Sequence, residues 1–151
     1  MRTIFFDMDG TIADLYGVEN WLESLINSDT HPYAVARPLV NLNSLARRLN
    51  SLTRQGYGVA IVSWTSKHGT IEYNEEITAV KKKWLAIHLK SVKWTEINIV
   101  PYGTNKSAFL KNEHDILFDD EARNREEWTE NGGIAFDEKS ILEILKKMGN
   151  E

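Results

Sequence analysis

The sequence predicts an α/β fold in which a mainly parallel, five-stranded sheet carries helices on both faces. Five short apolar runs are present, and their residues do not alternate with polar ones, which is typical of strands buried on both faces. They cover residues 4–6, 59–62, 97–100, 116–118 and 134–136. Longer segments with helical periodicity lie between these runs, and the alternation of strand and helix favours a parallel sheet.

Three helices are predicted from apolar stripes and from residues typical of helix ends. Leucines spaced three or four residues apart lie on one face of the segment 42–52. A second stripe covers residues 77–88, and Asn74 is its predicted N-cap. A third covers residues 141–148 and ends at Gly149, a residue type common at helix C-termini.

Length and composition are those of one ordinary globular domain, residues 1–151. The chain has 151 residues, 42% hydrophobic and 26% charged, and a domain commonly has about 150 residues. With only 9 Gly and 3 Pro, this balance excludes collagen, coiled coil and intrinsic disorder. The apolar runs fall well short of the ~18 residues that a membrane helix needs, so we expect no membrane partner.

Charge and cysteine content exclude further classes. The formal net charge is −4, so the chain lacks the strongly basic character of many nucleic-acid-binding proteins. It has no cysteine, which excludes disulfides and thiolate metal sites and fits a cytoplasmic location. Nothing in the sequence defines an oligomeric state.

Polar residues follow the predicted strands. Asp7 and Asp9 come after the first apolar run and Ser63 directly after the second, while Asp119 and Asp120 follow the fourth. The carboxyl ends of parallel strands meet at one edge of the sheet, where open α/β sheets bind their ligands. We therefore expect these side chains to converge in one cleft, together with Lys106 from a short helix.

Four carboxylates in one cleft repel one another, and a single lysine does not neutralise them. Either their pKa values rise or a cation lies among them. Ligands that are all oxygen favour a hard ion, and Mg²⁺ is the natural choice, held by Asp119 and Asp120. The substrate group that best suits Mg²⁺, a lysine and a hydroxyl together is a phosphate.

The spacing suggests a role for each group in phosphoryl transfer. Asp7 can attack phosphorus and form an aspartyl-phosphate. Asp9 can protonate the leaving group and then deprotonate the water that hydrolyses the intermediate. Ser63 can donate a hydrogen bond to a phosphoryl oxygen, and Lys106 can offset its charge.

Some of these assignments have alternatives. Thr65 and Ser66 are alternatives to Ser63, and Lys111 is an alternative to Lys106. We predict Ser63 because it directly follows the apolar run, and Lys106 because it opens a short helix near the sheet edge.

Trp64 and the run of lysines at 81–83 each have two possible interpretations. Trp64 is either a packed side chain or a platform that stacks a base near the bound phosphate. The lysines at 81–83 are predicted to lie on the solvated side of their helix, with attraction of a polyanion as the alternative.

Four segments resemble the motifs of the haloacid dehalogenase-like (HAD) phosphohydrolase superfamily. Residues 5–14, Phe-Phe-Asp-Met-Asp-Gly-Thr-Ile-Ala-Asp, look like the first motif, and Val-Ala-Ile-Val-Ser at 59–63 looks like the second. Lys106 is similar to the third, and Ile-Leu-Phe-Asp-Asp at 116–120 to the fourth. The resemblance covers nearly the whole chain and implies a Rossmann-like three-layer α/β/α fold with sheet order 5-4-1-2-3. It also implies Mg²⁺-dependent transfer through Asp7, with Asp7 and the backbone carbonyl of Asp9 as metal ligands.

Two narrower resemblances suggest a substrate. Arg37-Pro38, the strand and hydroxyls at 58–66, Lys83-Trp84 and the double-aspartate strand are similar to 5'(3')-deoxyribonucleotidases. The last two also resemble the 3'-phosphatase half of phage polynucleotide kinases. The expected function is a Mg²⁺-dependent phosphomonoesterase acting on a nucleotide, with a polynucleotide 3'-phosphatase as the alternative.

The segment 16–36 is expected to be a minimal cap, because it is too short for a full helical cap domain. It offers a short helix around residues 20–26 and then a polar loop at 27–31. Its candidates for contacting whatever leaves with the phosphate are Tyr16, Trp21, His31 and Tyr33, with packing of the short helix as the alternative. So small a cap leaves an open cleft that a nucleic-acid end could enter.

A non-catalytic phosphate-binding module or a receiver-like phospho-switch is the competing class. In a receiver domain, two acidic residues follow the first strand, and a single aspartate that accepts the phosphoryl group follows the third. Here the double acid comes near the end of the chain, which favours the phosphatase.

Overall fold

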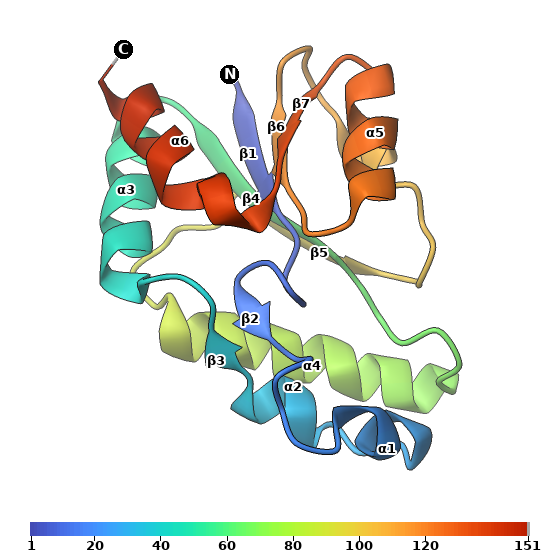
Figure 1. Cartoon of the computed structure of the whole chain (residues 1–151). Helices are drawn as coiled ribbons and strands as arrows, with labels where there is room; N and C mark the ends of the chain where they lie inside the picture. Colours follow the sequence, from blue (N-terminus) through green and yellow to red (C-terminus); the bar gives the residue numbers. More distant parts are fainter. Residues whose placement is uncertain (151) are drawn as a thin grey trace.

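The computed structural model of the chain describes residues 1–150 and is built on a five-stranded parallel sheet (Figure 1). Its spatial order is β5-β4-β1-β6-β7, and each neighbouring pair is parallel. The strands are β1 (Thr3–Phe6), β4 (Gly58–Trp64), β5 (Glu96–Val100), β6 (Ile116–Phe118) and β7 (Ile134–Phe136). Counted along the chain and read from the β7 edge, this is the order 5-4-1-2-3 that the HAD resemblance implies.

Burial follows the position of each strand in the sheet. All residues of β1 and β6 are buried, and β4 is buried up to Ser63, as predicted for strands covered on both faces. The edge strands β5 and β7 are only partly buried along their whole length. The five predicted apolar runs are therefore all strands, with complete burial confined to the three in the centre.

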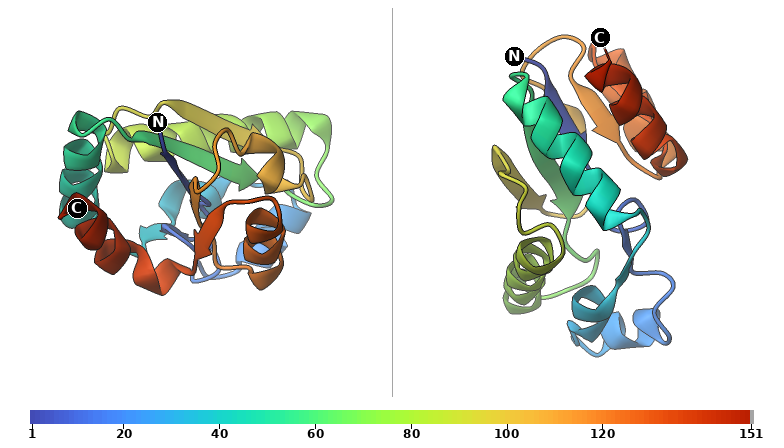
Figure 2. Two further views of the ribbon diagram at one scale, coloured as in Figure 1. Left: turned by 90° about the horizontal axis from the view of Figure 1, so that it is seen from above. Right: turned by 90° about the vertical axis from the view of Figure 1, so that its left-hand side faces the viewer.

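Helices cover both faces of the sheet, which confirms the three-layer α/β/α arrangement (Figure 2). On one face, α3 (Leu42–Arg54), α6 (Ile141–Gly149) and the end of α4 (Ile71–His88) pack on Ile4 and Phe6. On the other face, α5 (Ala122–Glu130) places Trp128 against Phe5, with ring centroids 5.1 Å apart. The 3₁₀ helices η1 (Lys106–Phe109) and η2 (Glu138–Ser140) complete the chain.

The predicted start of α4 is wrong. The helix begins at Ile71, and its cap is Thr70, whose side chain accepts a hydrogen bond from Tyr73 N at 3.1 Å. Asn74 lies inside the first turns, where its Oδ1 accepts from Ser66 N and Ser66 Oγ at 3.2 and 2.7 Å. Both residues are good N-caps, and Thr70 is the one with the extended backbone that a cap requires.

The chain between β1 and α3 forms a small separate layer. Two short strands, β2 (Ala13–Asp14) and β3 (Arg37–Pro38), pair antiparallel and enclose α1 (Trp21–Ile26) and α2 (His31–Val35). The position of α1 agrees with the predicted short helix. The predicted polar loop ends earlier than expected, because α2 begins at His31 and carries Pro32 in its first turn, where proline is tolerated.

This layer is fastened to α4 (Figure 1, bottom). Tyr33 of α2 packs with Tyr73 and Ile77 of α4 in one buried cluster. The hydroxyl of Tyr73 donates to the carbonyl oxygen of Asp29 at 2.8 Å, and Trp84 Nε1 donates to the carbonyl oxygen of Ala36 at 2.9 Å. The segment therefore has a defined position over the carboxyl ends of the strands.

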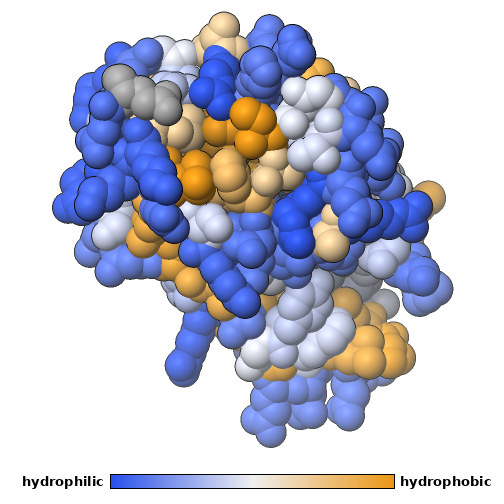
Figure 3. All heavy atoms as spheres, turned by 45° about the horizontal axis from the view of Figure 1, so that its top comes forward, coloured by the Kyte–Doolittle hydropathy of each residue, from blue (hydrophilic) through white to orange (hydrophobic). Residues whose placement is uncertain are grey.

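The face drawn in Figure 3 is largely hydrophilic, with apolar side chains gathered near its centre and at its lower right. Two of the exposed large apolar side chains, Leu22 and Ile26, belong to α1 and are 54% and 73% exposed. Within residues 1–150, no helix combines the length and the apolar character that crossing a membrane requires.

Candidate active site

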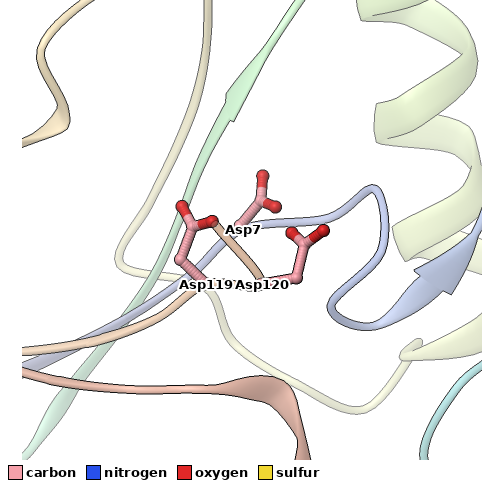
Figure 4. A group of neighbouring side chains, drawn as sticks. All are labelled: Asp7, Asp119 and Asp120. Carbon is pink, nitrogen blue, oxygen red and sulfur yellow. The ribbon is translucent and has the colours of Figure 1, made fainter. Parts of the chain in front are cut away.

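Three carboxylates meet at the carboxyl ends of β1 and β6 (Figure 4). Asp7 directly follows β1, and Asp119 and Asp120 directly follow β6. Each offers an oxygen, and these oxygens all lie within 4.8 Å of one another. The two strands are hydrogen-bonded neighbours, so residues far apart in the sequence reach the same point.

Lys106 lies between two of these carboxylates. Its Nζ is 3.0 Å from Asp7 Oδ1 and 2.7 Å from Asp119 Oδ2, and its side chain is 2% exposed. Asn105 caps η1 by accepting from Ser107 N at 2.9 Å, which fixes where Lys106 leaves the backbone. The alternative, Lys111, is 45% exposed and pairs with Glu96 outside the site.

The turn after β1 supports Asp7 and Asp120. Thr11 Oγ1 lies 3.1 Å from Asp7 Oδ2 and 3.2 Å from Asp120 Oδ1, and it accepts from Asp120 N. Gly10 has φ +78°, and a Cβ there would lie 2.4 Å from Asp120 Oδ2. The glycine is therefore required by both backbone conformation and space. Thr11 lies in the segment that resembles the first HAD motif, but no role was predicted for it from the sequence.

Asp119 is fully buried and its oxygens are held by several donors. Besides Lys106, it accepts from Asn124 Nδ2 at 3.1 Å and from Glu121 N at 2.9 Å. Asn124 lies on α5 and was not predicted, because a single asparagine outside the motifs carries no sequence signal. These contacts orient Asp119 from the side of the sheet that α5 covers.

Charge repulsion shapes the protonation of the cluster. Burial and the nearby charge of Asp7 raise the pKa of Asp120 to about 8 and that of Asp119 to about 6. Burial alone would raise the pKa of Asp7 too, but Lys106, a hydrogen bond with Asp120 and Lys81 together hold it below its usual value. A divalent cation would stabilise the ionised form of these neighbouring carboxylates. Because all of their ligand atoms are oxygen, a hard cation such as Mg²⁺ fits best.

A second lysine also lies in the site, contrary to prediction. Lys81 was expected on the solvated side of its helix, but its side chain is 1% exposed. Its Nζ donates to Asp9 Oδ2 at 2.7 Å, to Ser63 Oγ at 2.9 Å and to the main-chain oxygen of Trp64 at 2.7 Å. Two ammonium groups, rather than one, therefore face the four carboxylates.

The spacing of α4 explains the error. Lys81 lies four residues after Ile77 and three before Trp84, so it shares the apolar face of the helix. The next two lysines, Lys82 and Lys83, are exposed as predicted. The helical spacing of the apolar residues in α4 could therefore have placed Lys81 on the buried face. The run of three lysines hid this, because such a run usually indicates a solvated face.

The three candidate hydroxyls, Ser63, Thr65 and Ser66, lie differently with respect to the cavity described below. β4 continues past Ser63 to Trp64, so Thr65 is the first residue after the strand. Ser63 is completely buried and faces Lys81, whereas Thr65 lines the cavity described below. Ser66 also lines the cavity, but its Oγ donates to Asn74 Oδ1 at 2.7 Å. The sequence predicted that this strand ends at Val62, two residues before its actual end. Ser63 was therefore expected just after the strand, where the structure has Thr65.

A cavity of about 500 Å³ opens over the carboxylates. Asp7, Asp9, Lys106 and Asp120 line its polar end. Its other walls carry apolar and aromatic side chains from Leu15, Tyr16, Trp21, Leu22, Leu25, Ile26, Tyr33, Trp64 and Tyr102, and polar ones from Ser28, Thr65, Ser66, Lys67, His68, Thr70, Glu121 and Asn124. The predicted contacts Tyr16, Trp21 and Tyr33 thus all reach it, while His31 is not among its lining residues.

Trp64 lines the cavity, but the N–H group of its indole is already used in a hydrogen bond. Its Nε1 donates to the carbonyl oxygen of Thr104 at 2.9 Å. The ring lies 5.0 Å from Lys106 Nζ and 4.9 Å, between centroids, from Tyr102. The indole therefore packs between the polar end of the cavity and an exposed aromatic ring.

Comparisons with known proteins bear on the fold. The chain matches no family model and no curated protein sequence. It does resemble the D,D-heptose 1,7-bisphosphate phosphatase of B. bronchiseptica, solved with magnesium and phosphate, at TM-score 0.60 and 13% identity, covering 98% of this chain and 99% of that one. The corresponding phosphatase of Burkholderia thailandensis aligns at TM-score 0.54 and 10% identity, over 97% of this chain and 99% of that one. Across almost its whole length, the chain has the α/β fold of these phosphatases.

Proposed function

We propose that this chain is a Mg²⁺-dependent phosphomonoesterase of the HAD type, with residues 1–151 as one domain and residues 16–36 as a minimal cap. One observation carries the proposal: the carboxylate of Asp7 belongs to the three-aspartate cluster, bonds to Lys106 and lines the cavity. A nucleophile, a metal site and a phosphate-binding cation therefore share one surface.

The acidic cluster fits the metal. Asp7, Asp119 and Asp120 supply carboxylate oxygens, and the HAD resemblance adds the backbone carbonyl of Asp9. When bound, Mg²⁺ neutralises negative charge on the phosphoryl group and on the carboxylates around it. This agrees with the raised pKa values of Asp119 and Asp120, which reflect burial and the nearby negative charge of Asp7.

The side chains supply the remaining steps. An oxygen of Asp7 bonds to phosphorus as the bond to the leaving oxygen breaks, and Asp9 gives that oxygen a proton. Asp9 then takes a proton from water, whose oxygen bonds to phosphorus as the bond to Asp7 breaks. Lys106 and Thr65 stabilise the phosphoryl oxygens in both steps. The products are an alcohol and inorganic phosphate, and Asp7 is regenerated.

The aromatic walls support a nucleotide as substrate. A base can stack on rings such as Trp21 or Trp64, and stacking is favourable for every base. The faces of these rings offer a polyhydroxylated sugar few hydrogen-bond partners, so they suit a base better. A specific feature supports the alternative, a polynucleotide 3'-phosphatase: Lys67 lines the cavity and is exposed, where it can pair with a further phosphate of a strand.

The test is a substrate screen with purified protein and Mg²⁺. We expect turnover of p-nitrophenyl phosphate and a preference for nucleoside monophosphates or 3'-phosphorylated oligonucleotides over sugar phosphates. Asp7→Asn should retain the fold by circular dichroism and lose turnover. Activity in that variant would reject the covalent mechanism, and a preference for a sugar bisphosphate would reject the nucleotide assignment.

A further inference from the structure

Lys81 is a buried ammonium group with all of its donors engaged. It lies inside α4, and its side chain is 1% exposed. Its three N–H groups meet three acceptors: Asp9 Oδ2, Ser63 Oγ and the main-chain oxygen of Trp64. These acceptors come from the turn after β1 and the end of β4, so one side chain ties the two segments together.

Lys81 lies behind the cavity wall, whereas its partner Asp9 lies on it. Asp9 lines the cavity, and Lys81 is not among the residues of 1–150 that do. The ring of Tyr33, from α2, lies over the ammonium group with its centroid 5.3 Å from Nζ. A substrate in the cavity would therefore contact Asp9 and not Lys81.

The contact leaves one oxygen of Asp9 available. Lys81 occupies Oδ2, and no other side-chain hydrogen bond to the Asp9 carboxylate occurs within residues 1–150. Burying an ammonium ion is unfavourable unless its acceptors are well placed. At this position, the acceptors include the carboxylate that faces the cavity.

We propose that Lys81 is a positioning residue, which holds Oδ2 of Asp9 so that Oδ1 is presented to the leaving oxygen of the phosphomonoester. The inference rests on the proposed function. In the first step, the proton moves from Oδ1 of Asp9 to the leaving oxygen as its bond to phosphorus breaks. Lys81 keeps its protons throughout. Because Lys81 acts only through Asp9, its effect on this first step should scale with how strongly the leaving group needs a proton.

The experiment compares two aryl phosphates in Lys81→Met. Phenyl phosphate releases a strongly basic phenolate and depends on protonation, whereas p-nitrophenyl phosphate releases a weakly basic one. We expect kcat/KM, which reports the steps up to release of the leaving group, to fall about 100-fold for phenyl phosphate and less than about 10-fold for p-nitrophenyl phosphate, since proton transfer typically contributes ~10²–10⁴ in rate. The Mg²⁺ concentration for half-maximal activity should not change. Lys82→Met, on the exposed side of the same helix, is the matched control and should behave as wild type.

Lys81→Arg provides a second variant if the methionine variant does not fold. Arginine keeps the charge, but its planar guanidinium does not reproduce the donor directions of an ammonium group. We expect a folded protein, by circular dichroism and thermal melting, with a smaller loss that is again greater for phenyl phosphate.

The outcomes separate this inference from the proposed function. Equal losses of kcat/KM on both substrates in a folded variant, or no loss, would overturn the role of Lys81 while leaving the phosphatase intact. A wild-type protein that hydrolyses neither aryl phosphate with Mg²⁺ would overturn the proposed function, and the role of Lys81 with it.

Discussion

The ammonium group of Lys106 lies 3.0 Å from Oδ1 of Asp7, with both side chains buried. Burial alone would raise the pKa of Asp7, but the positive charge of Lys106 is the strongest influence that lowers it, and the net pKa is below the usual value. Asp7 is therefore ionised at neutral pH, as a carboxylate nucleophile must be. The same ammonium group reaches Asp119, so it joins Asp7 to the buried carboxylate that follows β6.

Replacing Lys106 with methionine should lower kcat/KM for p-nitrophenyl phosphate by about 10²–10³, the usual loss when a donor to developing charge is removed. Steady-state kinetics at saturating Mg²⁺ measure this. Lys111→Met is the control, because Lys111 is partly exposed and pairs with Glu96 away from the cavity. Comparable losses in the two variants would contradict the assignment of Lys106.

Replacing Thr65 and replacing Ser63 should have different effects on activity. If Thr65 is the phosphate-binding hydroxyl, Thr65→Ala should lower kcat/KM by about 10-fold or more, as for a hydrogen bond to a charged group. Ser63→Ala should lower it less for p-nitrophenyl phosphate, because Ser63 is completely buried and reaches Asp9 only through Lys81. The reverse order in parallel assays would restore Ser63.

Metal binding should strengthen as the pH rises from 6 to 8. Burial and the charge of Asp7 raise the pKa of Asp120 to about 8 and that of Asp119 to about 6. Mg²⁺ needs both groups ionised, so its binding must displace protons in this range. Titration calorimetry in two buffers of different ionisation enthalpy would detect the released protons.

The same shifts predict how Mg²⁺ affects stability. A raised carboxyl pKa stabilises the fold below the unfolded value near 3.8, and this contribution is lost as the pH rises through about 8 for Asp120. Mg²⁺ should restore it, so the increase in Tm on adding Mg²⁺ should be larger at pH 8 than at pH 6. Asp120→Asn should weaken this pH dependence, and an unchanged dependence would count against the assignment.

The three central strands were predictable because each is a continuous apolar run, and burial on two faces demands such a run. The edge strand β5 contains Asn98 and is only partly buried, but its remaining apolar residues still indicated a strand. α5 was not predicted for a related reason. Among its residues only Asn124 and Trp128 are buried, so it carries no apolar stripe. The N-terminus of α4 was misplaced because Thr70 and Asn74 are both good caps, and the choice depends on backbone angles that the sequence does not display.

The site was predictable where its residues follow strands, and much less so where a helix supplies them. Asp7, Asp119 and Asp120 converge because parallel neighbouring strands end together. Lys81 approaches from α4, and its pairing with Asp9 spans 72 residues of sequence. The apolar stripe of α4 places Lys81 on the buried face of the helix, but the acceptors that it meets there depend on how α4 packs on the sheet.

Asp115 should be important for stability rather than for activity. It is completely buried, and its carboxylate accepts from Thr3 N, Lys111 N and Asn112 N at 2.8, 3.0 and 2.9 Å. Asp115→Ala would leave these donors without a partner, at about 1–3 kcal/mol for each one that stays buried. Urea unfolding should show a loss of about 3 kcal/mol or more in the free energy of unfolding.

The control for this prediction is Glu113→Ala, in the same loop and exposed. It should leave the unfolding midpoint within experimental error of wild type. At temperatures where Asp115→Ala remains folded, its kcat should match wild type, since Asp115 does not line the cavity. A normal midpoint with reduced kcat would show that Asp115 serves the site instead.

Trp21 tests whether the segment 16–36 contacts the substrate. Its ring lines the cavity and packs edge-on against Tyr16, with centroids 5.0 Å apart. If a base stacks here, Trp21→Ala should raise KM for a nucleoside monophosphate by about 10-fold, within the range that base stacking provides. The KM for the smaller p-nitrophenyl phosphate should change less, and kcat should change little for either, because Trp21 does not touch the carboxylates. Val35→Ala, on the exposed part of α2 and outside the cavity, is the control. An equal rise in KM for both substrates would mean that Trp21 shapes the cavity without recognising a base.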